Sequence, residues 1–133
     1  MSVFEHIPHD EWIADNRLVF SIRDANPVSP GHSLVVPKRV FASWFDATAE
    51  EIVAMTELVA VVKHQLDRSH GPDGYNVGFN DGVAAGQTVF HAHVHVITRF
   101  DGDVPAPEGG VRHAVTGSGS PARAPGPRST PDR

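Results

Sequence analysis

The pattern of apolar positions predicts several strands around one long helix. Two short apolar segments, residues 17–23 and 32–36, flank a turn-rich connection, residues 24–31, and this arrangement predicts an antiparallel pair. Residues 75–80 alternate like a strand, and residues 88–98 have the strongest strand pattern of the chain. Since these strands do not alternate regularly with helices, the pattern indicates an α+β fold.

The long helix is expected from Thr48 to about Ser69. Thr48 and Glu51 have the spacing of a capping box, in which two side chains satisfy unpaired N–H groups of the first turn. Apolar residues then recur at steps of three and four and form one stripe: Ile52, Met55, Val59, Val62 and Leu66. Gly71-Pro72 predicts where the helix stops.

The length and composition fit one domain followed by a tail. With 133 residues, of which 40 % are apolar, the chain is long enough to form a core of its own. We assign residues 1–116 to that domain. Residues 117–133 are rich in Pro, Gly and Ser and cannot bury enough surface to offset the entropy of ordering, so we expect a flexible tail there.

The charge balance and the missing residue types exclude several functions. Sixteen acidic and eleven basic residues give a net charge of −5, which argues against a nucleic-acid-binding surface but not against a small anionic ligand. The chain has no cysteine, which excludes disulfides, thiol catalysis and cysteine-ligated zinc. Neither a signal-peptide pattern nor an apolar run of about 20 residues is present, so we expect a cytoplasmic protein with no membrane partner.

Three histidines, His91, His93 and His95, alternate with small apolar residues in the segment 88–98. In a strand, alternate residues project from one face, with Cα atoms about 6.6 Å apart at each step. The three imidazoles should therefore line one open face, while the apolar residues join the core under the helix. Packing does not explain three imidazoles in strict alternation, so the segment predicts a functional site.

Two chemistries compete for this site. Neutral imidazoles are common zinc ligands, and His32 or His113 can supply a further ligand. Alternatively, the central imidazole attacks phosphorus while its neighbours fix its tautomer and stabilise the developing charge. The preceding segment Gly86-Gln87-Thr88 favours phosphorus, because it offers a closely approaching backbone, an amide and a hydroxyl to phosphate oxygens.

These residues carry a resemblance to a known family. The segment from Gly86 to Ile97, with its His-x-His-x-His run, resembles the signature of the histidine triad (HIT) superfamily. The segment from Asp24 to Lys38 is similar to the family's other half-site, and Asn80-Asp81-Gly82 lies where the family places a polar residue near the phosphate. The resemblance covers roughly residues 10–104.

The resemblance implies both a fold and a mechanism. The implied fold is a five-stranded antiparallel sheet packed with one long helix, usually paired as a homodimer. The implied activity is that of a nucleotide hydrolase of the dinucleoside polyphosphate type. In that mechanism His93 attacks the α-phosphorus, a nucleotidyl-histidine forms, and water releases a nucleoside monophosphate. No cofactor is implied.

The resemblance also assigns roles residue by residue. His91 and His95 flank the nucleophile, His32 completes the imidazole network, and Thr88 assists the leaving group. The substrate-binding residues would be Asp24 at the ribose, Gln87 and Asn80 near the phosphate, and Ile22 at the base, with Phe4 and Ile7 as further base contacts. Asp24, Asn80 and Thr88 also fit purely structural roles in a turn, a hairpin and a strand.

The chain differs from the usual family pattern at two places. Some relatives hold a structural zinc with an N-terminal cysteine pair and a histidine after the Pro-Lys segment; this chain has neither, so we expect no metal. Thr98-Arg99 stands where Pro-Arg is common, so the geometry with which the chain leaves the catalytic strand can differ from that of the family.

The alternatives to the hydrolase are a nucleoside phosphoramidase, a nucleotidyl transferase, and a nucleotide-binding module without catalysis.

Overall fold

The computed structural model of the protein describes residues 2–116. The predicted tail, residues 117–133, lies outside the described residues. Contacts divide the chain after Arg99 into two compact units, Met1–Arg99 and Phe100–Arg133, which we describe separately. The predicted domain boundary at residue 116 stays a prediction.

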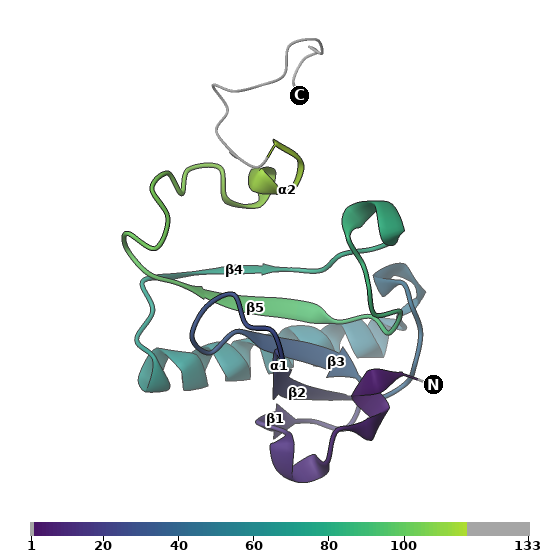
Figure 1. Cartoon of the computed structure of the whole chain (residues 1–133). Coiled ribbons are helices and arrows are strands. Elements are labelled where there is room, and N and C mark those ends of the chain that lie inside the picture. Colours follow the sequence, from purple (N-terminus) through teal and green to yellow (C-terminus); the bar gives the residue numbers. More distant parts are fainter. Residues whose placement is uncertain (1, 117–133) are drawn as a thin grey trace. The chain divides into compact units, whose positions relative to one another are not determined.

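The first unit is built on a five-stranded antiparallel sheet with the order β1-β2-β3-β5-β4 (Figure 1). Its strands are β1 (Ala14–Asp15), β2 (Val19–Arg23), β3 (Ser33–Pro37), β4 (Gly74–Gly78) and β5 (Val94–Arg99). The sheet and the long helix confirm the predicted α+β class, and the pairing of β2 with β3 confirms the predicted antiparallel pair. The homodimer stays a prediction.

The long helix α1 (Ala49–Ser69) lies across one face of the sheet, behind it in Figure 1. Its capping box is formed as predicted: Thr48 Oγ1 accepts from the Glu51 N–H at 3.1 Å, and the Glu51 carboxylate accepts from the Thr48 N–H at 2.8 Å. Gly71 follows the helix with a φ of 58°, a left-handed conformation that glycine adopts without strain.

Short helical turns connect the larger elements. Residues 2–99 of the first unit contain four 3₁₀ turns: η1 (Val3–His6), η2 (His9–Glu11), η3 (Trp44–Asp46) and η4 (Val83–Ala85). The second unit contains η5 (Gly110–Arg112) and α2 (His113–Thr116). Within residues 2–116, no helix combines the length and the apolar character required to cross a membrane.

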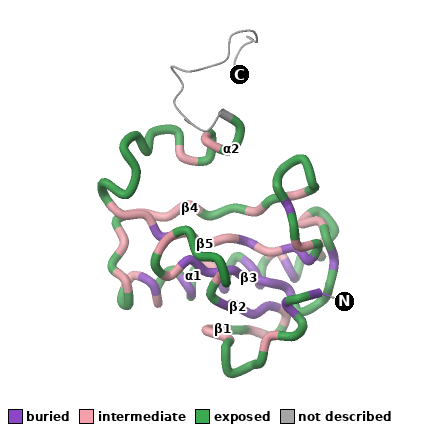
Figure 2. Tube along the Cα trace, viewed as in Figure 1, coloured by how far each residue is buried: buried purple, intermediate pink, exposed green. Residues whose placement is uncertain are grey.

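Consecutive residues along β2 and β3 are buried, as the purple tube shows (Figure 2). Because successive side chains of a strand point to opposite faces, both faces of the sheet are covered there. On the first face, apolar residues of the sheet pack against α1: Val19, Val35, Val94 and Val96 against Ala54, Met55, Leu58, Val62 and Leu66. On the second face, a smaller cluster forms with the N-terminal segment: Phe4, Phe20, Ile22, Leu34 and Val36. The second face is therefore covered by the N-terminal turn rather than by a long helix.

The prediction of a strand over residues 88–98 was wrong in its first half, because β5 begins only at Val94. The ladder between β3 and β5 extends from Ser33↔Val96 to Val35↔Val94, and β3 then ends at Pro37, which has no N–H to donate. In this part of the segment, the Ala92 N–H instead donates to the Phe41 carbonyl, after the end of β3, at 2.7 Å.

We predict that Leu66→Ala will lower the free energy of unfolding by about 2–5 kcal/mol, the usual cost of a cavity left by a fully buried leucine. Leu66 is 0 % exposed in the cluster between α1 and the sheet. Urea titration measures the change. Val61→Ala, at a position of the same helix that is 44 % exposed, should change it by less than about 0.5 kcal/mol. Equal effects of the two substitutions would contradict this description of the core.

Candidate active site

A cavity of about 410 Å³ lies on the second face of the sheet, beside the N-terminal turn. Three paired residues of adjacent strands form part of the cavity floor: Ile22 of β2 pairs with Leu34 of β3, which pairs with His95 of β5. Apolar side chains form one part of the lining: Val3, Phe4, Ile7, Ile22, Leu34 and Val89. Polar residues form the other part: Arg23, Asp24, Asn26, Asn80, Gln87, Thr88, His93 and His95. The cavity thus has an apolar wall and a polar wall that holds two imidazoles.

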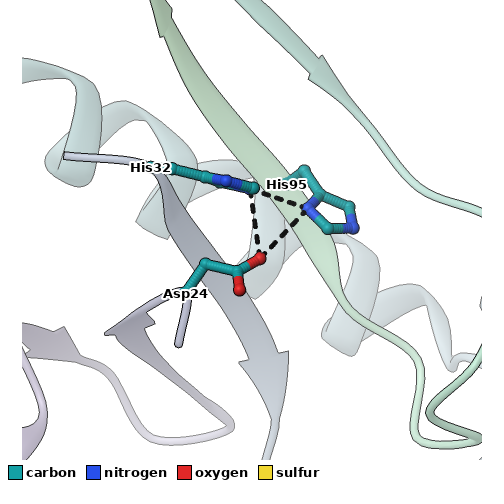
Figure 3. Close-up of side chains that lie close together, drawn as sticks. All are labelled: Asp24, His32 and His95. Carbon is teal, nitrogen blue, oxygen red and sulfur yellow. Dashed lines mark hydrogen bonds and ion pairs between the residues drawn. The ribbon is translucent and has the colours of Figure 1, made fainter. Parts of the chain in front are cut away.

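At the polar wall, Asp24, His32 and His95 come together from the loop before β3 and from β5 (Figure 3). His32 Nε2 lies 2.9 Å from His95 Nδ1 and 3.3 Å from Asp24 Oδ2. The Val28 N–H donates to His32 Nδ1 at 3.2 Å, so in the neutral ring the proton of His32 is on Nε2. His32 therefore donates toward His95 Nδ1 and Asp24, and His95 carries its own proton on Nε2, the nitrogen that points away from both partners in Figure 3.

The same three residues are also the group best placed to hold a metal ion among residues 2–116, since their ligand atoms all lie within 4.8 Å of one another. A metal on His32 Nε2 would require the proton to move to Nδ1, where the Val28 N–H already donates. The tautomer set by the backbone thus opposes a metal here. We interpret the three residues as a hydrogen-bonded chain, and the absence of a metal stays a prediction.

His93 lines the cavity, and its ring is oriented by the backbone just before it. His93 Nδ1 lies 2.7 Å from the His91 carbonyl oxygen. Because a carbonyl can only accept, Nδ1 carries the proton, and Nε2 of the neutral ring keeps its lone pair. The edge of Phe4 packs on the ring, with centroids 5.1 Å apart, and His95 lies at the same centroid distance. The ring is therefore fixed with a lone pair available at Nε2.

His91 corrects the prediction that the three imidazoles share one open face. His91 precedes β5, is only 1 % exposed, and does not line the cavity. Its Nε2–H donates to the Pro37 carbonyl at 2.7 Å, and its Nδ1 lies 2.8 Å from Ser2 Oγ. His93 and His95 do line the cavity, so two imidazoles rather than three can reach a ligand directly.

The remaining predicted residues all lie at the cavity, but not with equivalent surroundings. Thr88 and Asn80 are exposed at its edge. The amide of Gln87 is buried and bonds to the backbone: Oε1 accepts from the Gly82 N–H, and Nε2 donates to the Ala42 and Val89 carbonyls. In this structure Gln87 thus holds the loop that ends at Thr88, instead of presenting its amide to a ligand.

Residues outside the predicted site hold the loop that carries Asp24 and His32 in place. Thr98, fully buried on β5, donates from Oγ1 to the Pro30 carbonyl at 2.6 Å, and it accepts from Ser29 Oγ at 2.8 Å. Gly31 has a φ of +88°, and a Cβ there would lie 2.8 Å from Leu66 Cδ2. Thr98 is where the family commonly has proline, and this departure was the only signal that pointed to it.

Burial favours the neutral form of three histidines, His32, His91 and His95, by lowering their pKa values. Loss of hydration lowers the pKa of His95 to about 4, and the neighbouring His93 and His32 add to this effect against the opposing charge of Asp24. Burial also lowers the pKa of His32, which Asp24 partly offsets, and it lowers the pKa of His91. At neutral pH these rings therefore act as hydrogen-bond donors and acceptors rather than as fixed positive charges.

Comparison with known sequences identifies related proteins over most of the first unit. The family described as HIT domain matches residues 7–102. Adenylylsulfatase HINT3 of Arabidopsis thaliana is 34 % identical over 89 residues, which cover 67 % of this chain and 45 % of that protein. The asymmetrical bis(5'-nucleosyl)-tetraphosphatase of Schizosaccharomyces pombe is 39 % identical over 77 residues, or 58 % and 42 % of the two chains.

A further relative and a solved structure agree with this match. The AP-4-A phosphorylase of Mycobacterium tuberculosis is 37 % identical over 95 residues, which cover 68 % of this chain and 47 % of that protein. The chain thus spans less than half the length of these three curated relatives. The crystal structure of a Hit-like protein from Bartonella henselae, 28 % identical, superposes with a TM-score of 0.71 over 77 % of this chain and 82 % of that one.

The lowered histidine pKa values predict how stability depends on pH. In the unfolded chain histidines protonate near pH 6.5, at about their ordinary pKa. In the folded chain the pKa values of His32, His91 and His95 are lowered, that of His95 to about 4, so the unfolded state binds more protons from about pH 6.5 down to about pH 4. The free energy of unfolding should therefore fall as the pH is lowered through this window. The lowered pKa of Glu51 adds to this decline only from about pH 4.5 downward.

Urea titrations at successive pH values test this dependence. His95→Asn removes one of the buried titrating rings and should make the decline shallower. His64→Asn, at an exposed position of α1, is the control. A flat profile in the wild-type protein, or the same slope in wild type and His95→Asn, would contradict the prediction.

Proposed function

The chain belongs to the HIT family, and on this basis we propose that it hydrolyses a nucleotide phosphoanhydride at the α-phosphorus, with dinucleoside polyphosphates as its substrate class. The observation that carries the proposal is the fixed tautomer of His93. Its Nδ1–H is bound to the His91 carbonyl at 2.7 Å, and the ring lines a cavity of about 410 Å³. A neutral imidazole held in this way presents a nucleophilic lone pair to a ligand in the cavity.

The first step is an exchange of bonds at phosphorus. His93 Nε2 forms a bond to the α-phosphorus, the bond from phosphorus to the bridging oxygen breaks, and the leaving phosphate takes the electron pair. The proposed role of Thr88 is to donate its hydroxyl hydrogen bond to this leaving oxygen, for which its exposed position at the cavity edge is suitable. The product is a nucleotidyl-histidine on His93, whose positive ring remains bonded to the His91 carbonyl through Nδ1–H.

The second step returns the enzyme to its starting state. Water attacks phosphorus and gives up a proton to the solvent, the P–N bond breaks with its electron pair returning to His93 Nε2, and a nucleoside monophosphate leaves. The hydrogen-bonded chain supports both steps, since His32 donates to His95 Nδ1 and thereby leaves the His95 Nε2–H free to donate to a phosphoryl oxygen. Such a preorganised donor stabilises the charge that develops in the transition state without reorientation during the reaction.

The nucleoside is proposed to occupy the rest of the cavity. Ile22, with Phe4 and Ile7 from the N-terminal segment, offers an apolar wall suited to a base. Asp24 is proposed to accept from the ribose hydroxyls, because Oδ1 and Oδ2 can accept from two vicinal hydroxyls at once. Asn80 is proposed to contact the phosphate directly. For Gln87 we propose an indirect role, through the loop that it holds beside Thr88.

The relatives leave the leaving group and the acceptor open. The names of three relatives imply release of sulfate from an adenylyl group, hydrolysis of a bis-nucleosyl tetraphosphate, and phosphorolysis of AP-4-A, respectively. All three reactions fit one nucleotidyl-histidine, followed by attack of water or phosphate. A nucleoside phosphoramidase fits it as well. A binding module without catalysis fits less well, because the fixed His93 tautomer has no evident purpose in binding alone.

Replacement of the proposed nucleophile should abolish turnover. We expect His93→Ala to lower kcat/KM for diadenosine tetraphosphate on the order of 10⁴-fold or more, by analogy with other nucleophile deletions. With a radiolabelled adenylyl substrate, the wild-type protein should form an acid-labile adduct that His93→Ala lacks. His64→Ala, on the exposed side of α1, should behave like wild type. Activity retained in His93→Ala would refute the assignment, and binding without turnover or adduct would favour the non-catalytic module.

A panel of substrates should rank the leaving groups. We expect kcat/KM for diadenosine tetraphosphate to exceed that for an adenosine phosphoramidate and for adenylyl sulfate by at least about tenfold, since cavity contacts commonly discriminate by this much. Each assay is run with water alone and with added inorganic phosphate. Release of adenosine diphosphate only when phosphate is present would identify a phosphorylase instead. Faster turnover of the phosphoramidate would identify the phosphoramidase.

A further inference from the structure

The buried hydroxyl of Ser2 connects the N-terminal turn to the histidine segment by a hydrogen bond. Ser2 is 7 % exposed and His91 is 1 % exposed, and their side chains meet at 2.8 Å across 89 positions of the sequence. Ser2 also begins the turn η1: its Oγ accepts from the Phe4 N–H at 3.1 Å, and its own N–H donates to the Glu5 carboxylate at 2.8 Å. One serine thus belongs both to the cap of a turn and to the histidine network.

The direction of the hydrogen bond between Ser2 and His91 follows from its neighbours. The Pro37 carbonyl can only accept, so His91 carries its proton on Nε2, 2.7 Å from that oxygen. Nδ1 of the neutral ring must therefore accept, and Ser2, whose oxygen already accepts from Phe4, has its hydroxyl hydrogen free to donate. Burial, which lowers the pKa of His91, keeps the ring in this neutral form. Every polar atom of the His91 ring and the Ser2 side chain is then used.

The hydrogen bonds of His91 also connect to His93. The main-chain carbonyl of His91 accepts from His93 Nδ1–H at 2.7 Å, so the position of His91 decides how the next imidazole is turned. We propose that Ser2 is a positioning residue of the reaction: by donating to His91 Nδ1 it fixes the orientation of the His91 ring, and it thereby holds the carbonyl that orients His93. The proposal rests on the proposed function of His93, but it concerns a residue that the family signature does not contain.

The alternative is that Ser2 merely stabilises the N-terminal turn. Val3, Phe4 and Ile7 of this segment line the cavity, whereas Ser2 does not. A loosened turn would displace these apolar side chains and raise KM. Loss of the hydrogen bond to His91 would lower kcat and leave KM nearly unchanged. The two explanations are therefore separated by which kinetic constant changes.

The test is Ser2→Ala, compared with Ser2→Thr and Ser43→Ala in the full-length chain. Ser43 is a matched control, because it caps the 3₁₀ turn η3 by accepting from the Phe45 N–H at 3.1 Å, as Ser2 does in η1, but it does not contact a histidine. We expect Ser2→Ala to lower kcat about tenfold, the effect of one supporting hydrogen bond, with KM changed less than about twofold. Ser2→Thr keeps a hydroxyl and should restore most of kcat, and Ser43→Ala should leave both constants unchanged.

Nitrogen NMR of the histidine rings supplies a readout that does not depend on turnover. In the wild-type protein, His91 should have a protonated Nε2 and an unprotonated Nδ1. In Ser2→Ala the signal of the unprotonated Nδ1 should shift, because it loses its hydrogen-bond donor, while Nε2 stays protonated through its bond to the Pro37 carbonyl. If the wild-type protein turns over no nucleotide, the proposed function fails while the NMR comparison still tests the link to Ser2. Unchanged His91 shifts in Ser2→Ala, a fall in kcat equal to that of Ser43→Ala, or an effect on KM alone would overturn the proposal.

Discussion

The hydrogen bond from the buried ring of His91 to the Pro37 carbonyl joins the end of β3 to the segment before β5, and the geometry of the cavity depends on this junction. Two further bonds run between the same segments: the Ala92 N–H donates to the Phe41 carbonyl, and the Gln87 amide donates to the Ala42 carbonyl. They replace the ladder that a longer β5 would have formed with β3. Because the acceptors are backbone carbonyls, the path of residues 37–42 positions the His91 ring and the backbone beside it. The histidine segment is thus irregular in conformation, and these bonds give partners to the His91 ring, the Ala92 N–H and the Gln87 amide.

The junction is tied in turn to the start of the long helix. Arg39, between the two carbonyls at Pro37 and Phe41, donates to both oxygens of Glu51, from Nε at 2.9 Å and from Nη2 at 2.7 Å. Glu51 is 4 % exposed and also accepts from the Thr48 N–H in the capping box, and these donors lower its pKa. A carboxylate with three N–H donors and little exposure is held far more firmly than a surface ion pair. The capping box that starts α1 therefore also holds, through Arg39, the segment against which the histidines are positioned.

The parts of the fold that the sequence predicts well are those set by local rules. The helix, its capping box and the β2–β3 pair depend on spacing and turn residues within about 20 positions, and they form as predicted. The start of β5 was missed because it depends on where β3, nearly 60 positions earlier, stops offering partners. The same error placed three imidazoles on one face, although the structure buries His91 beneath it. The hydrogen bonds of Ser2 and Thr98 could not be predicted from the sequence for a related reason. A serine or threonine hydroxyl can donate to almost any nearby acceptor, and the fold determines which acceptor is near.

The loop from Asp24 to His32 is divided into positions with very different freedom to vary. Pro30 and Gly31 are held between Thr98 and Leu66, so a larger residue at position 31 would need a compensating change in the helix. In contrast, the side chains at positions 25–28 are exposed. Main-chain groups there bond to the site instead: the Asn26 N–H donates to Asp24, and the Val28 N–H donates to His32. Exchange of residues 25–28, with proline excluded at 26 and 28, therefore offers protein engineers a way to vary the rim beside the cavity without disturbing the imidazoles. Over evolutionary time, the same division would let the rim of the cavity vary in related chains while the hydrogen bonds that hold Asp24 and His32 stay constant.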